Sequence, residues 1–600
     1  MGHMPRAISG GLWRNVSLIV KNPERFEGCY MYTRRLSLDE NYAECAMFYN
    51  IKIDGDFARD YEVEVEGECN GHKFYKKDKV WSFSDNCFIY VKDAQFWWPR
   101  NAGEPNLYNV TAKLLKNGKE LDRKEFTLGI RSVELFYSKC VNEAGEGDFH
   151  FEINGKKIFM MGTNWVPMDP FHSRDKQRLP KALEMADDVG CNMMRCWGGN
   201  VYEDDDFYDF CDRHGIMIWQ DFGMACGVYG VDDRFLGLIY DEAVAVIKRL
   251  RQHPCLALWS GDNECDSQNE PFYMAYHREP NENESTRRVI KKALRQHDFT
   301  RPYIPSSPYL IDVNMYDYRG ENRVVPPEEH TWGPRDYFKS ESYTKLLCYF
   351  ASECGYHGCP SPQTLKKIIR PDQLWPIFEE GGKAKTDWQL HATCCEDEDG
   401  VQNTYRLPLM SSHVDTMFGG ADNIEDFARR SQCSQAEAFK YFIERFRLEK
   451  WRRTGILWWN LVDGWPQISD AVVDYYYSKK LAYHFIKRSQ NPVCVMVAEP
   501  QDGKYKIFAV NDLPQDKQVT VKITDLKNGK LLCESTFTAP ADKSINFAEL
   551  DEVNDLTMFK IEYSYDGKNY LNHYTTKTRD IKAEEYLDLL DKCGIAEFDF

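Results

Sequence analysis

The 600-residue chain has no run of 18 apolar residues, no Cys-x-x-Cys pair among its 20 cysteines, and no GxGxxG or phosphate-loop motif. The first absence argues against a membrane-spanning helix. The second argues against a zinc ribbon or a thioredoxin-like centre, so we expect mostly reduced, buried thiols. The third argues against a nucleotide-binding sheet. We therefore expect no cofactor and no structural metal.

Positively charged residues are also fewer than negatively charged ones. The chain has 76 Lys and Arg and 94 Asp and Glu, which gives a net charge of −18. This balance disfavours nucleic acid and anionic membranes as partners. The opening MGHMPRAISG has no apolar signal core. We expect a cytoplasmic protein by default. Secretion stays open because the natural amino terminus is not fixed by this sequence, and the oligomeric state is not predicted.

The order of apolar patterns predicts three domains. Residues 1–138 contain short alternating segments typical of an immunoglobulin-like β-sandwich. Residues 139–488 alternate apolar strands with amphipathic helices, which is typical of parallel sheets. Residues 489–600 return to alternating strands, as expected for a second β-sandwich, and end in a short acidic helix. The first sandwich should include the strands LWRNVSLIV, AECAMFYNIKI, DYEVEVEGEC, NCFIYVKD, LYNVTAKLL and KEFTLGIRSVEL.

The central region supplies eight strand candidates. They are KKIFMMGTNW, CNMMRCWGG, GIMIWQDF, CLALWSGDNE, PYIPSS, a poorly defined segment before His330, CYFASECG and GILWWNLVDGW. Eight strand–helix repeats predict a (β/α)8 TIM barrel with insertions. A doubly wound open sheet is the structural alternative, disfavoured by the missing phosphate-binding loops.

Two carboxylates stand where predicted barrel strands end. The apolar run LALW stops at SGDNE and delivers Asn263 and Glu264, and CYFASECG delivers Glu353. The carboxyl ends of barrel strands meet at one face, so we expect the two carboxylates to share a pocket. Glycoside cleavage needs such a pair, one to protonate the leaving oxygen and one to attack the anomeric carbon or activate water.

Polar and aromatic residues occupy the other strand ends. They are Asn164, Trp165, Arg195, Trp197, Gln220, Asp221, His330, Trp332, Trp458, Trp459, Asn460 and Asp463. Hydroxyl-binding groups and flat aromatic faces together suit a sugar, although each residue alone could equally serve packing. Trp458 and Trp459 are adjacent in a strand, so only one of them should face the pocket.

Several long segments resemble glycoside hydrolase family 2, and within it the β-mannosidase branch. The block CNMMRCWGGNVYEDDDFYDFCDRHGIMIWQDFGMAC resembles the family's strand 2 to strand 3 region. LALWSGDNE is similar to its acid/base motif, FASECGYHGCPS to its nucleophile motif, and GILWWNLVDGWPQISDAVVDYYYSKKLAYHFIKRS to its strand 8 block. The resemblance implies an exo-acting, retaining β-glycosidase, most similar to a β-mannosidase, that acts on a β-linked oligosaccharide or glycoside.

The resemblance also implies roles for individual residues. Glu264 would be the acid/base and Glu353 the nucleophile of a double displacement through a covalent glycosyl-enzyme, with the carboxylates about 5 Å apart. Asn263 would bind the 2-hydroxyl, and Arg195 would keep Glu353 ionised. The remaining substrate-binding residues would be Asn164, Trp165, Trp197, Asp221, His330, Trp332, Trp458 and Trp459.

Four features depart from the family pattern. Asn200 stands where the family usually has a third glycine, and Asp262 stands where it usually has an asparagine. Cys354 stands in the place of a phenylalanine, and Tyr356 and His357 follow it. The first three departures leave the sugar open, with β-galactosidase or β-glucuronidase as alternatives. The fourth is that GGLWRNVSL resembles the end of the family's jelly-roll sugar-binding domain. We therefore expect residues 1–20 to be the tail of that domain, which the chain would otherwise lack, and the active site to be open.

Two other classes of function remain as alternatives. A non-catalytic glycan-binding barrel is one, and the presence of both Glu264 and Glu353 argues against it. A metal-dependent barrel hydrolase is the other. It would need clusters of His and Asp at several strand ends, where only His330 is available.

Overall fold

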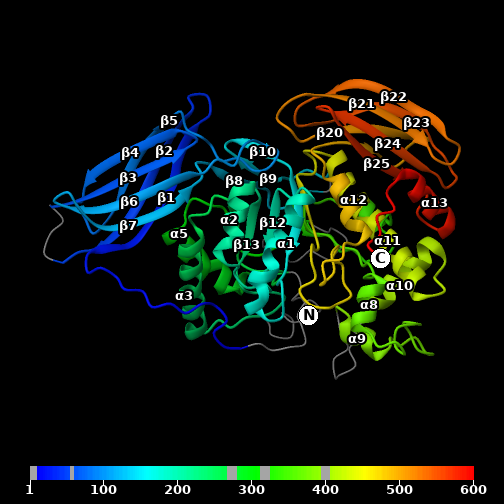
Figure 1. The fold of residues 1–600 in the computed structure, drawn as a ribbon, viewed down its shortest axis with the longest axis horizontal. Coiled ribbons are helices and arrows are strands. Elements are labelled where there is room, and N and C mark those ends of the chain that lie inside the picture. The colour runs from blue at the N-terminus through cyan, green and yellow to red at the C-terminus, as the bar shows by residue number, and fades with distance from the viewer. Residues whose placement is uncertain (1–9, 55–59, 143, 267–279, 311–324, 394–405) are drawn as a thin grey trace. The chain divides into compact units, whose positions relative to one another are not determined.

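The computed structural model describes residues 10–54, 60–142, 144–266, 280–310, 325–393 and 406–600 (Figure 1). The contacts divide the chain into two compact units. The amino-terminal unit comprises Leu12–Ile158 and Asn192–Pro326, and the carboxy-terminal unit consists mainly of Phe159–Cys191 and Pro327–Phe600.

The amino-terminal unit begins with an antiparallel β-sandwich. One sheet has the order β1-β2-β5 and the other β4-β3-β6-β7. The strands are β1 (Arg25–Ser37), β2 (Tyr42–Lys52), β3 (Tyr61–Cys69), β4 (His72–Lys79), β5 (Ser84–Lys92), β6 (Tyr108–Lys116) and β7 (Lys119–Leu128). Alternation sets the two faces: Val63 and Val65 are in the core, while the intervening Glu64 pairs with Lys113.

Two predictions for this sandwich need correction. LWRNVSLIV, residues 12–20, forms no strand, and its Leu12, Val16 and Leu18 are exposed. KEFTLGIRSVEL is divided between the end of β7 and the separate strand β8 (Val133–Tyr137). The segment does not form one continuous strand because its two halves belong to different sheets: β7 pairs with β6, whereas β8 pairs with β9 (Phe149–Ile153).

Four parallel strands of the barrel lie in the amino-terminal unit, in the order β15-β14-β13-β12. They are β12 (Met193–Cys196), β13 (Met217–Asp221), β14 (Leu256–Ser260) and β15 (Tyr303–Ile304). The helical elements of this unit are α2 (Asp205–His214), α3 (Asp233–Leu250), η3 (Pro280–Glu282), the π-helix η4 (Ser285–Ile290) and α5 (Lys291–His297). α2 ends at Gly215, whose φ is +66°. A Cβ there would lie 2.8 Å from Arg100 N, so glycine is required.

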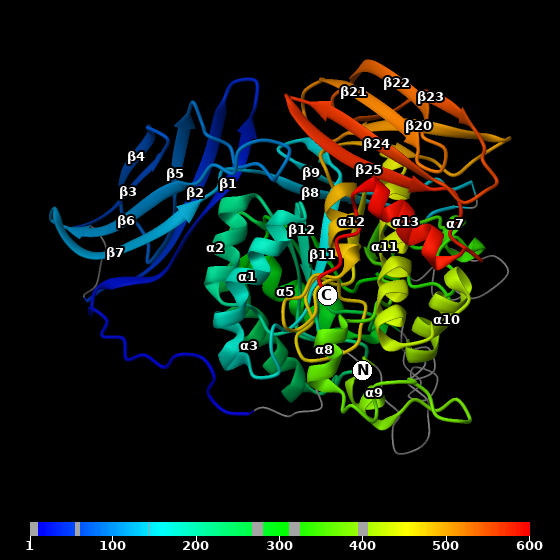
Figure 2. The same ribbon diagram turned by 45° about the vertical axis from the view of Figure 1, so that its right-hand side comes forward.

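The other four parallel strands lie in the carboxy-terminal unit, in the order β11-β18-β17-β16. They are β11 (Met160–Trp165), β16 (Glu328–His330), β17 (Phe350–Glu353) and β18 (Gly455–Trp458). The described helices of this unit before the second sandwich are η2 (His172–Arg174), α1 (Asp175–Asp188), α7 (Glu341–Thr344), α8 (Pro362–Ile368), α9 (Thr386–His391), α10 (Arg406–Phe418), α11 (Ile424–Leu448) and α12 (Leu481–Ser489). α11 and α12 pack side by side (Figure 2).

Each of the eight predicted barrel segments contains an observed parallel strand. One segment is shorter in the barrel than expected. In KKIFMMGTNW, the strand β10 (Lys156–Ile158) turns back on β9, and only β11 is parallel. The reversal occurs at Asn154–Gly155, both with positive φ, which is the conformation of a tight hairpin turn.

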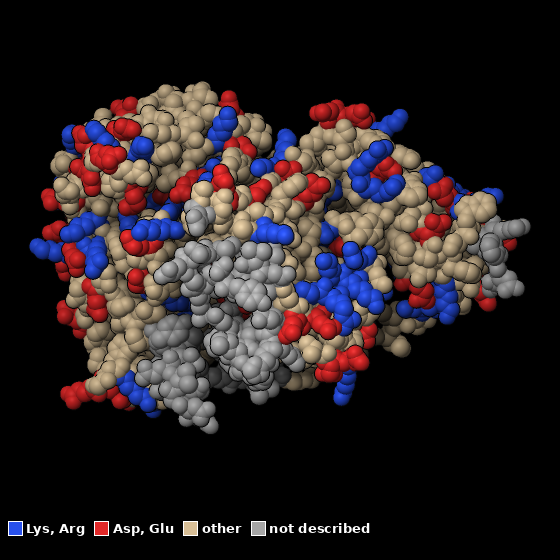
Figure 3. All heavy atoms as spheres, turned by 180° about the vertical axis from the view of Figure 1, so that it is seen from behind, with Lys and Arg blue, Asp and Glu red and all other residues tan. Residues whose placement is uncertain are grey.

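The chain ends in a second antiparallel sandwich, with sheets β19-β20-β23 and β22-β21-β24-β25. The strands are β19 (Val493–Val497), β20 (Lys504–Asn511), β21 (Lys517–Asp525), β22 (Lys530–Ala539), β23 (Lys543–Asp551), β24 (Met558–Tyr565) and β25 (Lys568–Thr575). Helix α13 (Ala583–Cys593) follows. None of the described helices has the length and hydropathy that a bilayer-spanning segment needs. Acidic and basic side chains are interspersed on the face seen in Figure 3, so the net negative charge is not one acidic patch there.

Candidate active site

In the amino-terminal unit, backbone hydrogen bonds hold the segment after β14 firmly. Asn263 N donates to Met224 O at 2.9 Å, and Glu264 N donates to Ser307 O at 2.8 Å. Glu264 has φ of +56° and is only 8% exposed. A left-handed conformation is uncommon for glutamate and costs on the order of 1–3 kcal/mol, so the surrounding contacts must impose it. Such strain motivates a functional hypothesis for Glu264.

A buried network orients Asn263. Arg195 Nη2 donates to Asp221 Oδ2 and to Asn263 Oδ1, each at 2.7 Å, and both charged side chains are fully buried. Trp219 Nε1 and Gly198 N donate to the same Asp221 carboxylate. With its oxygen held by Arg195, Asn263 presents its amide Nδ2 as a donor.

We expect Arg195→Gln to lower the free energy of unfolding by about 3–5 kcal/mol, because Asp221 would remain buried without its cation. The double variant Arg195→Gln/Asp221→Asn should lose less stability than the single variant, since no charge is stranded. Denaturant unfolding followed by tryptophan fluorescence measures both. Equal losses in the single and double variants would contradict this interpretation of the pair.

Cys226 was not identified from the sequence, yet it lies between the site residues. Its Sγ is 3.4 Å from Glu264 Oε2 and accepts from Asn263 Nδ2 at 3.2 Å. Like Glu264, it has a positive φ, of +45°. A lone cysteine in a loop carries no sequence signal. Its position follows from the backbone bridge between Ala225 and Asn263, which only the folded loops provide.

Asp262, one of the departures, is completely buried. Its carboxyl accepts from Ser306 Oγ at 2.5 Å and from Asn283 Nδ2 at 3.1 Å. Burial, with a smaller contribution from the charge of Asp266, raises the pKa of Asp262 to about 8. Asp262 is therefore mostly protonated at neutral pH, so it is close to the asparagine of the family pattern and adds little charge beside Glu264.

This pKa predicts how stability depends on pH. The folded state retains a proton that the unfolded chain releases above pH 3.8, so stability should fall as pH rises from about 4 to about 8. Asp262→Asn removes this titration and should raise the free energy of unfolding by up to about 5 kcal/mol at pH 8, because the pKa lies roughly four units above its ordinary value and one unit is worth about 1.4 kcal/mol. The gain should shrink toward pH 4. Denaturant unfolding at several pH values measures it, with Asp502→Asn at an exposed turn as the control. A gain that does not vary with pH would rule out the titration.

In the carboxy-terminal unit, Glu353 lies at the end of β17 and is 3% exposed. Trp332 Nε1 donates to Glu353 Oε2 at 3.0 Å, and His330 Nδ1 lies 3.4 Å from the same oxygen. The backbone carbonyl of Glu353 accepts from Thr331 N at 2.7 Å. The residues after β16 therefore fix both the main chain and the carboxylate of Glu353.

Aromatic packing holds Trp332 in place. The Arg335 guanidinium lies 3.8 Å from the centre of its ring, and Trp459 packs edge-on with ring centroids 6.2 Å apart. A Cβ on Gly355 would lie 2.3 Å from the indole, which explains a glycine two residues after Glu353. Trp458 points elsewhere: its Nε1 donates to Gln490 and its ring packs on Phe439 of α11.

The other predicted residues of these strand ends are buried. Asn164 joins three barrel strands by donating to Ser352 O and Leu457 O. Trp165 and Trp197 are 1% and 3% exposed. Asn200 lacks a positive φ, so its position does not require a glycine.

The residues that depart from the nucleophile motif are packed in the carboxy-terminal unit. Tyr356 stacks on His413 with ring centroids 3.9 Å apart. His357 Nδ1 lies 2.7 Å from Asp470 Oδ1. Cys354 is 1% exposed, and burial raises the pKa of its thiol. These side chains therefore serve the packing behind Glu353.

One cluster could offer three ligand atoms to a metal within the amino-terminal unit. Asp209, Asp212 and His253 have these atoms within 4.8 Å of one another. The two closest members, His253 and Asp212, are held together by a hydrogen bond, with His253 Nδ1 at 2.7 Å from Asp212 Oδ2. Asp212 Oδ1 accepts from Cys255 N at 2.8 Å. We therefore assign this cluster a structural role.

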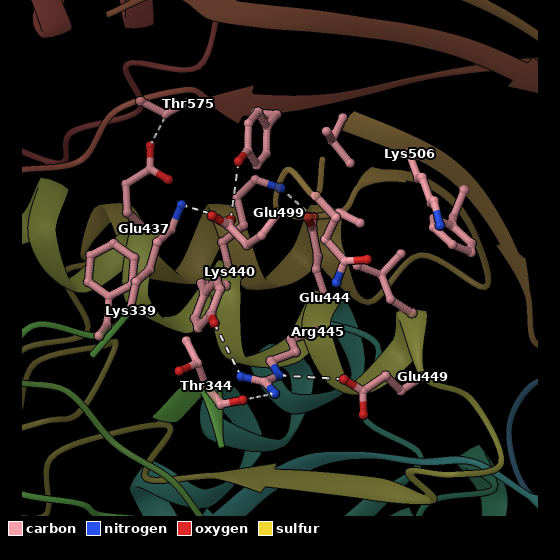
Figure 4. A pocket seen from close by; sticks show the side chains of 18 residues that line it. Lys339, Thr344, Glu437, Lys440, Glu444, Arg445, Glu449, Glu499, Lys506 and Thr575 are labelled. Atoms are coloured by element: carbon pink, nitrogen blue, oxygen red, sulfur yellow. Dashed lines mark hydrogen bonds and ion pairs between the residues drawn. The ribbon is translucent and has the colours of Figure 1, made fainter. Parts of the chain in front are cut away.

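A cavity of about 390 Å³ in the carboxy-terminal unit contains none of the predicted site residues. It lies between α11 and the second sandwich, and several of its charged side chains form ion pairs with one another (Figure 4). Lys339 pairs with Glu499 at 2.8 Å, Lys440 with Glu444, and Arg445 with Glu449 at 3.7 Å. Its charges are thus largely neutralised inside the cavity.

Comparisons with known proteins give a consistent result. The family model "Glycosyl hydrolases family 2" matches residues 34–131, and "Glycosyl hydrolases family 2, TIM barrel domain" matches residues 147–315. A β-mannosidase of Capra hircus is 28% identical over 584 residues, covering 89% of this chain and 62% of that protein. β-Mannosidase B of Thermothelomyces thermophilus is 29% identical over 601 residues, covering 91% and 66%.

Solved structures agree on the fold. The β-D-mannosidase of Dictyoglomus thermophilum has a TM-score of 0.75 and 27% identity, covering 94% of this chain and 67% of that one. An Amycolatopsis orientalis exo-chitosanase, with a TM-score of 0.69 and 18% identity, is similar in fold. The predicted TIM barrel with flanking β-sandwich domains is confirmed. The chain spans less than two thirds of the length of the goat relative.

Proposed function

We propose that this chain, which matches family models of glycosyl hydrolase family 2 over residues 34–131 and 147–315, is a retaining, exo-acting β-glycosidase of the β-mannosidase type. The observation that carries the proposal is the placement of Glu264 and Glu353. Glu264 lies just after the buried parallel strand β14, Glu353 is the last residue of the buried parallel strand β17, and each is fixed by its own set of hydrogen bonds. Active sites of such barrels form at these strand ends.

Glu353 is proposed as the nucleophile. Its carboxylate accepts a hydrogen bond from Trp332 and has His330 within reach. These contacts hold the carboxylate in one orientation, and a carboxylate oxygen is the atom that would attack carbon. Attack on the anomeric carbon would give a covalent glycosyl-enzyme, and the bond to the leaving oxygen would break at the same time.

Glu264 is proposed as the acid/base. It would donate a proton to the leaving oxygen in the first step and take one from water in the second. Glu264 is 8% exposed, and its Oε2 accepts a hydrogen bond from the Cys226 thiol at 3.4 Å, so the carboxyl group has a defined orientation.

Substrate binding is proposed to involve both polar and aromatic groups. Asn263, whose oxygen is held by Arg195, offers Nδ2 to a sugar hydroxyl. Trp332 and Trp459 offer aromatic surface beside Glu353. Of the two adjacent tryptophans, Trp459 is proposed as the contact, because Trp458 packs on α11. The β-mannosidase relatives favour mannose as the sugar removed from a β-linked glycoside.

A panel of nitrophenyl β-glycosides tests the proposal: mannoside, galactoside, glucoside, glucuronide and N-acetylglucosaminide. We expect the mannoside to be cleaved at least about tenfold faster than the others, since differential transition-state binding decides kcat/KM. Preference for another sugar would overturn the mannosidase assignment while keeping the reaction class. A folded protein that binds mannosides but cleaves none of the panel would support the glycan-binding alternative. Activity that survives EDTA would separate the proposed mechanism from a metal-dependent one.

A further inference from the structure

A second cavity, of about 510 Å³, lies within the amino-terminal unit, away from the carboxyl ends of its barrel strands. It is formed where the first sandwich meets the segments around the start of β14. Its volume falls in the range of about 300–1,000 Å³ typical of small-molecule sites. Nothing in the proposed hydrolysis uses it.

Three arginines line this cavity: the buried Arg131 and Arg251 and the partly buried Arg301. Arg131 is 9% exposed, and its guanidinium donates to Pro254 O at 2.7 Å and to Leu256 O at 2.5 Å. Arg301 Nε donates to the same Leu256 oxygen at 2.7 Å. One carbonyl oxygen therefore holds two guanidinium groups side by side.

Arg251 adds a third cation. It is 9% exposed, donates Nη1 to His297 O at 2.8 Å, and keeps its Nε buried without a hydrogen-bond partner. A buried donor with no partner is costly, by about 1–3 kcal/mol. The flat face of its guanidinium is covered by Tyr30, at 3.5 Å from the ring centre. The group is thus preorganised, and its Nε lacks an acceptor.

The charges of the three arginines are not balanced. The structure gives Asp298 as the carboxylate partner of Arg301, at 2.9 Å, whereas Arg131 and Arg251 are bonded to backbone carbonyls. Asp212, the next carboxylate near Arg131, lies against His253. Burial, with a smaller contribution from the charge of Arg301, lowers the pKa of Arg131 to about 9. At the rim, Arg34 is paired with Glu44, and Glu134 is exposed.

The cavity of Figure 4 differs in this respect, because its Lys339, Lys440 and Arg445 each form an ion pair with a glutamate. The described hydrogen bonds of Arg131 and Arg251 go to backbone carbonyls and to no carboxylate, so an anionic ligand would complement these two guanidinium groups. A phosphate monoester carries a charge of about −1.5 to −2 at pH 7 and offers three strong acceptor oxygens. Planar guanidinium forks suit such oxygens geometrically.

We propose that this cavity, lined by Arg131, Arg251 and Arg301, binds the phosphate group of a small molecule. The cavity is much larger than a bare phosphate ion, so a sugar-sized body attached to the phosphate fits it best. The rings of Tyr32 and Phe299, which also line the cavity, offer apolar surface for that body. The site is independent of the proposed hydrolysis, so either proposal can fail without the other.

Isothermal titration calorimetry on the whole chain tests this site, with glucose 6-phosphate, glucose and inorganic phosphate as probes. We expect glucose 6-phosphate to bind with a dissociation constant below 1 mM in low salt, on the scale of a few charge-assisted hydrogen bonds. Glucose should not bind detectably here, and binding should weaken as salt is added. If inorganic phosphate binds as tightly as glucose 6-phosphate, the cavity is a phosphate site whose ligand is the free ion. Glucose binding as tightly as its phosphate, or no phosphate binding by the folded chain, would overturn the proposal.

Variants locate the site. Arg251→Gln should weaken glucose 6-phosphate binding at least about tenfold, because it removes a charged donor. Arg251→Lys should lose less, because it keeps the charge. The matched control is Arg452→Gln, since Arg452 is partly buried and, like Arg251, is bonded to backbone carbonyls, those of Leu347 and Cys348, but lies outside this cavity. Equal affinity in Arg251→Gln and Arg452→Gln, with both folded by circular dichroism, would exclude this location.

Discussion

Replacing Glu353 with alanine should reduce kcat for a nitrophenyl β-mannoside at least about 10³-fold, because the covalent intermediate can no longer form. Azide should restore part of the activity, since it is small enough to enter the space left by the carboxylate. It would attack from the face that Glu353 occupied, so the product should be the α-glycosyl azide. Rate measurements with and without azide, and analysis of the product by NMR, check both expectations.

The control for this prediction is Glu341→Ala. Glu341 is exposed in α7, twelve residues before Glu353, and pairs only with Lys345 among its described contacts. It should retain the wild-type kcat. Wild-type activity in a folded Glu353→Ala protein would remove Glu353 from the mechanism. A β-glycosyl azide from that variant would place the nucleophile elsewhere.

Replacing Glu264 with alanine should have an effect that depends on the leaving group. A methyl or alkyl β-mannoside needs a proton at its leaving oxygen, so kcat/KM should fall by about 10²–10⁴-fold. A dinitrophenyl mannoside leaves as a stable anion, and its kcat/KM should fall less than about tenfold, because the parameter reports only the first chemical step. A series of aryl mannosides of graded leaving-group pKa measures this dependence.

Azide distinguishes the two carboxylates further. In Glu264→Ala the covalent intermediate still forms on Glu353, and azide would attack it from the opposite face to give the β-glycosyl azide. The two variants should therefore give azides of opposite configuration. Equal losses for good and poor leaving groups would contradict an acid role for Glu264, and no azide product would contradict its role as base.

Much of the barrel could be predicted because its strands are short apolar runs that stop at polar residues. β14 and β17 are fully buried, so their apolar character continues without alternation, and the change to polar residues marks their ends. The strands that were missed lack this contrast. β4, with the sequence HKFYKKDK, buries Phe74 and little else, and β23 has no fully buried residue. An exposed strand carries too few apolar residues to show its period.

The site could be predicted only in part. Glu264 and Glu353 stand at strand ends, and their type and position are visible in the sequence. The contact of Cys226 with Glu264 is not, because it depends on two loops that join through backbone hydrogen bonds. The positive φ of Glu264 also has no signal in residue type. The charge of Asp262 is a further example, since burial, which follows from the whole fold, decides its protonation.

The central claim is that a sugar becomes covalently bound to Glu353. A 2-deoxy-2-fluoro-β-mannosyl fluoride tests it most directly, because the 2-fluorine slows both steps while the good leaving group keeps the first one fast enough to trap the intermediate. We expect time-dependent inactivation, one sugar added per chain by intact mass spectrometry, and the label on the peptide that contains Glu353. Turnover of mannosides without any trapped adduct, or a label on a different residue, would contradict the claim.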